Sequence, residues 1–141
     1  MNKSPPPRFS RLIVWGVRAG LVLFWLAVFA ATHTPVQHLP HTGVSNDKLQ
    51  HLLAYAVLGA LLTSALATLR PWSWRLVVIA IAIAGAYGVI DELTQLLVGR
   101  TADPKDWIAD VIGATIGSVV AGFFCAVVAK WTRKGQEPSA K

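Results

Sequence analysis

The chain has 141 residues, of which 54% are hydrophobic and 14% are charged, and it contains one cysteine. A soluble domain of this size is about 25% charged and has too little interior to bury so much apolar surface. The composition therefore excludes an ordinary soluble enzyme, a disordered chain and a secreted domain held together by disulfides, and it favours an integral membrane protein. The formal net charge of +6 arises mainly near the chain ends, which indicates membrane topology and no nucleic-acid partner.

Four apolar stretches approach the roughly 20 residues that a helix needs to cross a bilayer. They cover residues 12–31, 49–69, 76–98 and 107–129. Prolines and polar segments separate them, and no alternation with a period of two persists that would indicate strands. We predict an all-α domain over residues 12–131, an integral membrane four-helix bundle of up-down topology. It is expected to lie between a disordered basic tail, 1–11, and a polar tail, 132–141.

The basic residues predict how these helices are oriented. Ten of the thirteen Lys and Arg residues lie before residue 19, in the segment 70–75 or after residue 129. The other three lie in the loops 32–48 and 99–106. Because cytoplasmic segments of membrane proteins carry an excess of Lys and Arg, we predict that both termini are cytoplasmic and that these two loops are outside.

With this orientation, polar residues from three segments reach one depth at the outer leaflet. A charged group deep in a membrane span costs about 2.5–3.5 kcal/mol, so these side chains are expected to face the bundle interior and to find partners. Three of them, Asp47, His51 and Tyr55, are spaced by four residues and share one helix face. The candidate functional cluster comprises Asp47, Lys48, His51, Tyr55, Asp91, Glu92, Gln95, Arg100, Asp106 and Asp110.

Specific contacts are expected inside this cluster. We expect His51 to lie within direct or one-water hydrogen-bonding reach of Asp91. The two carboxylates of the third helix, Asp91 and Glu92, are expected to form buried ion pairs. Their expected partners are Lys48 or Arg100. The guanidinium of Arg100 could instead hold a phosphate group with two parallel hydrogen bonds.

Other patterns lie beside the cluster. Arg100 could also pair with Asp103 or Asp106 in a wet loop, and Asp103 could cap the fourth helix. The motif Gly113-x-x-x-Gly117 predicts close approach of another helix. Three histidines of the first loop are expected to be solvated, namely His33, His38 and His41.

The order and spacing of these residues resemble those of the VanZ-like family. The motifs are Asp47-Lys48-x-x-His51-x-x-x-Tyr55, Asp91-Glu92-x-x-Gln95, and Arg100-Thr101-x-Asp103-x-x-Asp106-x-x-x-Asp110-x-x-Gly113. Members are small multi-pass membrane proteins of bacteria, and the founding example lowers susceptibility to the glycopeptide teicoplanin. The resemblance implies a location in the bacterial plasma membrane. Family members usually carry Asn at the position of Asp110, so this chain has an additional carboxylate.

Three functions are compatible with these residues. The leading one is binding or handling of an anionic envelope lipid or lipid-linked precursor, with Lys48 and Arg100 as headgroup-binding candidates. The second is a metal-dependent intramembrane enzyme for phosphoester or acyl-transfer chemistry, although no recognisable catalytic motif is present. One imidazole with carboxylates would favour Mg²⁺ or Mn²⁺, and the candidate ligands are His51, Asp91, Glu92, Asp106 and Asp110. The third is a structural accessory subunit of a membrane complex.

Overall fold

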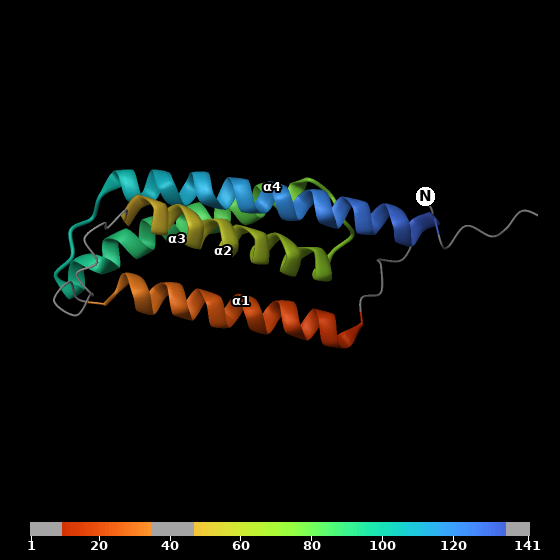
Figure 1. The fold of residues 1–141 in the computed structure, drawn as a ribbon, viewed down its shortest axis with the longest axis horizontal. Coiled ribbons are helices and arrows are strands. Elements are labelled where there is room, and N and C mark those ends of the chain that lie inside the picture. The colour runs from red at the N-terminus through yellow and green to blue at the C-terminus, as the bar shows by residue number, and fades with distance from the viewer. Residues whose placement is uncertain (1–9, 35–46, 135–141) are drawn as a thin grey trace, which may run out of the picture.

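The structure, a computed structural model, describes residues 10–34 and 47–134. Its elements are α1 (Arg11–Thr32), α2 (Asp47–Leu69), α3 (Arg75–Gln95), the short 3-10 helix η2 (Leu96–Val98) and α4 (Pro104–Lys134), as Figure 1 shows. Each of the four α-helices is long and apolar enough to cross a membrane. The predicted all-α class with four membrane-capable helices is therefore confirmed.

The helix boundaries differ from the prediction mainly in α4. This helix begins at Pro104, before the predicted start at residue 107, because proline suits the first helical position and Asp103 caps it. The carboxylate of Asp103 accepts a hydrogen bond from the backbone N–H of Lys105 at 2.9 Å. The helix also continues to Lys134, into the segment predicted as a tail. Residues 1–9 and 135–141 of the predicted tails lie outside the described residues.

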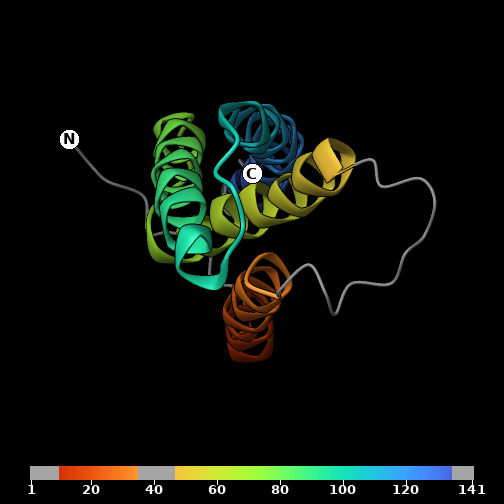
Figure 2. The same ribbon diagram turned by 90° about the vertical axis from the view of Figure 1, so that its left-hand side faces the viewer.

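The closest helix contact joins α2 and α4, which lie side by side in Figures 1 and 2. A Cβ atom on Gly113 would collide with the backbone carbonyl of Leu52, and one on Gly117 would collide with that of Ala56. Only glycine allows the two backbones to approach this closely. The close approach predicted from the spacing of Gly113 and Gly117 is therefore confirmed.

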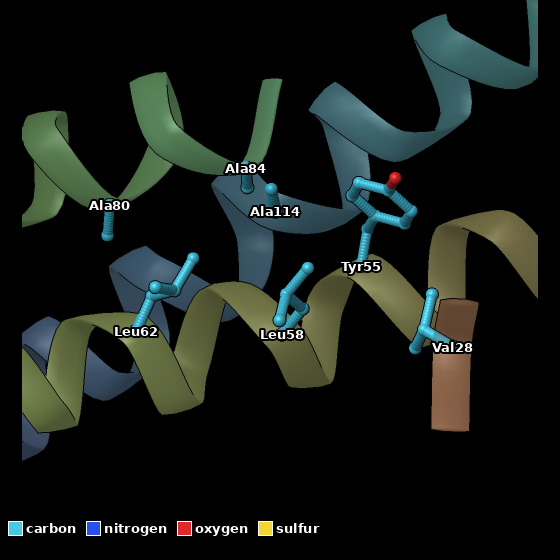
Figure 3. Packing of buried hydrophobic residues seen from close by; sticks show 7 residues of the cluster. All are labelled: Val28, Tyr55, Leu58, Leu62, Ala80, Ala84 and Ala114. Carbon is cyan, nitrogen blue, oxygen red and sulfur yellow. The ribbon is translucent and has the colours of Figure 1, made fainter. Parts of the chain in front are cut away.

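The hydrophobic core is built mainly by α2. Its side chains Tyr55, Leu58 and Leu62 point toward small residues of α3 and α4 (Figure 3). These neighbours are alanines, including Ala84 on α3 and Ala114 on α4, and both are fully buried. Large side chains on one helix thus fill the space that small side chains leave on the others, which brings three helices into one compact unit.

The first helix is attached more loosely than the other three. Figure 2 shows α1 set apart from the group formed by α2, α3 and α4. Among the residues of α1, all of which are described, only Val28 is buried. Its further contacts include the ring of Trp25, whose centroid lies 5.0 Å from that of Tyr87 on α3.

Candidate functional site

Polar side chains from all four helices meet at one end of the bundle, the left-hand end in Figure 1. The hydroxyl of Thr32, at the end of α1, reaches Asp91 near the end of α3. The ammonium of Lys48, at the start of α2, reaches Asp106 at the start of α4. The buried polar residues of this end are His51, Asp91, Glu92, Gln95, Asp106 and Asp110. The structure therefore brings together side chains that the sequence placed at one depth.

Asp91 is held by a complete set of hydrogen bonds on the side of α3 that faces α1. Its Oδ1 accepts from the hydroxyls of Thr32 at 2.9 Å and Tyr87 at 3.2 Å. Its Oδ2 accepts from the side-chain amide of Gln95 at 3.1 Å. The imidazole of His33 lies 3.8 Å from Oδ1. Both oxygens of this buried carboxylate are thus engaged by hydrogen-bond donors of the protein.

The direct hydrogen-bond partner of His51 among the described residues is Asp110, and no direct hydrogen bond to Asp91 is found. Its Nδ1 lies 2.9 Å from Oδ1 of Asp110, and both side chains are buried. The reason is the direction in which α3 presents its side chains: Asp91 faces α1, and α4 supplies the carboxylate that faces α2. The additional carboxylate noted in the sequence is therefore the one that binds the histidine.

Glu92 lies next to Asp91 in the chain but faces the loop before α4. Its Oε2 accepts a hydrogen bond from the backbone N–H of Asp103 at 2.8 Å. Its Oε1 is buried and has no partner among the described residues, and the same holds for Oδ2 of Asp110. The hydroxyl of Tyr55 is also buried without a described partner, while its ring stacks on that of Tyr87. Unsatisfied buried polar atoms of this kind are rare in folded proteins.

Lys48 bridges two carboxylates of the opposite helix start. Its Nζ lies 3.0 Å from Asp103 and 2.7 Å from Asp106. The expected pairing of Lys48 with Asp91 or Glu92 is therefore not found. The Lys105 backbone N–H, and after it the Lys48 ammonium, hold the pKa of Asp103 below its ordinary value of 3.8. The bridge ties the start of α2 to the start of α4.

A cavity of about 270 Å³ lies between α1 and α2. Its apolar wall includes Phe24, Ala27 and Val28 of α1. Its polar wall includes His51 and Arg100, together with Thr32, Asp47 and Gln50. Among the described residues, Arg100 forms no ion pair, so the expected pairing with Asp103 or Asp106 is not found either. The cavity is thus amphipathic, with Arg100 among the residues that line it.

Two groups of three residues could hold a metal ion within the described part of the chain. One consists of Asp47, His51 and Asp106, and the other of His51, Glu92 and Asp110. In each group the possible ligand atoms lie within 4.8 Å of one another. Asp91, one of the predicted ligands, belongs to neither group because its side chain faces the α1 side of the bundle.

The contribution of the end of α1 to the polar cluster was not predicted from the sequence. His33 was expected to be solvated, but its side chain is 12% exposed. Its Nδ1 lies 2.9 Å from the backbone carbonyl of Phe29, and its Nε2 lies 2.9 Å from the hydroxyl of Thr94 on α3. The spacing of four residues between Phe29 and His33 would have signalled that the helical path continues. His38 and His41 lie outside the described residues.

Fold and site together define a multi-pass helical membrane protein with a buried polar cluster at one end of its bundle. The sequence model of the VanZ/LLP1 family matches residues 17–125, which is most of the chain and includes every residue of the candidate cluster. The chain therefore belongs to the VanZ/LLP1 family, as the spacing of its polar motifs predicts. No curated protein and no solved structure matches it.

Proposed function

We propose that this protein binds the phosphate-bearing part of an anionic envelope lipid or lipid-linked precursor in the cavity between α1 and α2. In this proposal the bundle is up-down, it lies in the bacterial plasma membrane with both termini in the cytoplasm, and the cavity is at the outer leaflet. The observation that carries the proposal is the amphipathic lining, which combines apolar residues such as Phe24 and Val28 with the basic residue Arg100.

The two walls suit the two parts of a lipid. An acyl or prenyl segment would lie against the apolar residues of α1, which gains the free energy of burying apolar surface. The guanidinium of Arg100 offers parallel N–H donors that match a phosphate. Lys48, the other headgroup candidate, already bridges Asp103 and Asp106, so its charge is neutralised locally. Arg100 is therefore the residue to which we assign the headgroup.

The size and position of the cavity restrict what it accepts. Ligand sites typically measure about 300–1,000 Å³, so a cavity of about 270 Å³ suits a headgroup phosphate and the adjoining chain segment better than a whole lipid. Because α1 is attached loosely, such a ligand could enter sideways from the membrane. Handling a lipid-linked envelope precursor in this way would also connect the protein with glycopeptide susceptibility, since these antibiotics act on that precursor pool.

Lipid retention after purification tests this proposal. We expect Arg100→Lys to retain several-fold less anionic lipid in native mass spectrometry of the detergent-purified protein, because lysine keeps the charge but loses the two-pronged geometry. Ala27→Phe, which fills the apolar wall, should have the same effect. The matched control is Arg75→Lys, at the opposite end of the bundle. Equal retention by Arg100→Lys, Ala27→Phe and the wild type would overturn the proposal.

Cysteine labelling tests the orientation separately. In a Cys125→Ala background, a cysteine replacing Ala102 should react with an impermeant thiol reagent in intact cells. One replacing Ser73, in the loop between α2 and α3, should react only after the cells are opened. The opposite pattern would place the cavity at the inner leaflet and contradict the outer-leaflet assignment.

A further inference from the structure

A second binding site can be inferred on the side of α3 that faces away from α1, independently of lipid binding. We infer that His51, Glu92 and Asp110 form a binding site for one divalent cation of the class that prefers oxygen ligands, such as Mn²⁺ or Mg²⁺. The three residues come from α2, α3 and α4, and all are more than nine-tenths buried. One possible ligand atom from each lies within 4.8 Å of the other two.

The open oxygens of the two carboxylates are the observation that points to a ligand. Each carboxylate is fixed by the protein through one oxygen: Glu92 by the Asp103 backbone N–H, and Asp110 by His51. The other oxygen of each is buried and has no partner among the described residues. The open oxygen of Asp110 lies beside Gly88, where a Cβ would approach it to 3.1 Å. Gly88 is one helical turn from Glu92, so both open oxygens lie along the same face of α3.

The charge balance of this end of the bundle favours a cation. Six carboxylates lie between residues 47 and 110, but that range and the loop before it contain only three Lys or Arg residues outside the 70–75 segment. The single positive charge of Lys48 is shared between Asp103 and Asp106. Within the described residues, no Lys or Arg forms an ion pair with Glu92 or Asp110. Two neighbouring buried carboxylates repel each other, and a bound cation removes this repulsion.

His51 can ligate the same ion through its Nδ1. In the tautomer that carries the proton on Nε2, Nδ1 has a free lone pair, and it lies 2.9 Å from Oδ1 of Asp110. An ion bound there would replace the hydrogen bond between the two side chains. A set of two carboxylates and one imidazole suits Mn²⁺ or Mg²⁺, which complete their coordination with water. The histidine also lines the lipid cavity, so the cation would lie next to it.

The structure separates this site from its neighbours. In the group formed by Asp47, His51 and Asp106, the carboxylate of Asp106 already accepts a hydrogen bond from Lys48 at 2.7 Å. Asp91 is buried at a similar depth, but both of its oxygens have partners. Asp91 and Asp106 are therefore matched controls: they are buried carboxylates of the same bundle end that should not contribute a ligand.

Titration with Mn²⁺ tests the inference on the full-length protein in detergent. The electron paramagnetic resonance signal of unbound Mn²⁺ should report one bound ion per chain, and Mg²⁺ should displace it. Glu92→Gln and Asp110→Asn should each weaken Mn²⁺ binding by about ten-fold or more, because each removes a negatively charged ligand. Asp91→Asn and Asp106→Asn should stay within about three-fold of the wild type. Thermal unfolding with and without Mn²⁺ provides the second readout: the ion should raise the melting temperature of the wild type and not that of Glu92→Gln.

Two results would overturn the inference. One is the absence of Mn²⁺ binding to the folded wild type at millimolar concentration, which would mean that a shared proton and not a cation holds the two carboxylates together. The other is an equal loss of binding in Asp91→Asn and Glu92→Gln, which would mean that the ion binds to the acidic end without a defined site. Loss of Mn²⁺ binding in Arg100→Lys is not expected, so failure of the lipid proposal leaves this test unaffected.

Discussion

Asp91 and Glu92 are neighbours in the chain and are both buried, yet their carboxylates have different hydrogen-bonding surroundings on the two sides of α3. On the side facing α1, hydroxyl and amide groups engage both oxygens of Asp91. On the other side, Glu92 and Asp110 each keep one buried oxygen without a described partner. Side chains on adjacent helix positions differ in direction by about 100°, and here that rotation separates a closed hydrogen-bond network from an open one.

The carboxylates on the two sides of α3 therefore have different roles. A buried carboxylate with every oxygen engaged contributes to the attachment of the helices around it. A buried carboxylate with an open oxygen costs free energy that folding alone does not recover. We therefore regard the Asp91 side as the part that holds α1 to the bundle, and the side of Glu92 and Asp110 as the part available for binding.

The largest effect is expected from Asp91→Ala. This change removes the acceptor used by Thr32, Tyr87 and Gln95, and each donor left buried without a partner costs about 1–3 kcal/mol. We expect a melting temperature several degrees below that of the wild type, with α1 becoming more accessible to protease. Circular dichroism in detergent and limited proteolysis measure the two effects. As a control, Thr115→Ala removes an exposed hydroxyl of α4 and should leave both unchanged.

A smaller effect of opposite sign is expected from Glu92→Gln in the presence of a chelator. The glutamine carbonyl can still accept the hydrogen bond of the Asp103 backbone, and its amide group can donate to the open oxygen of Asp110. The free energy of unfolding should therefore stay the same or rise by up to about 1 kcal/mol. If this variant is instead destabilised as strongly as Asp91→Ala, the distinction between the two sides of α3 is wrong.

The smallest effect concerns acid. The Lys105 backbone N–H, and after it the Lys48 ammonium, lower the pKa of Asp103 in the folded protein. These two interactions therefore stabilise the fold above about pH 3.8, and their contribution is lost as the pH falls through the lower pKa of the folded state. The side chains of Lys48 and Asp103 are both substantially exposed, so the contribution is small. The difference in melting temperature between the wild type and Asp103→Asn should be present at pH 6 and decrease as the pH falls below 3.8. A difference that does not change with pH would show that the charge of Asp103 is not responsible.

Several features of the structure could be predicted because they depend on local pattern alone. Long apolar stretches must form helices in a membrane, since no water is present to satisfy the backbone. The spacing of Gly113 and Gly117 predicts close contact with another helix, because small residues four positions apart form one strip on a helix; the structure shows that this helix is α2. The capping role of Asp103 follows from its place before a proline that starts a helix.

The sequence by itself determined that six carboxylates, one histidine and a few cations gather at one end of four helices. Only the tertiary structure decided which of them meet. The rotation of α3 about its axis is set by packing against α1, α2 and α4, and a turn of one residue exchanges Asp91 for Glu92. For the same reason the partner of His51 is Asp110, the partner of Lys48 is Asp106, and His33 packs against α3: these contacts join residues about 60 positions apart, which no local pattern encodes.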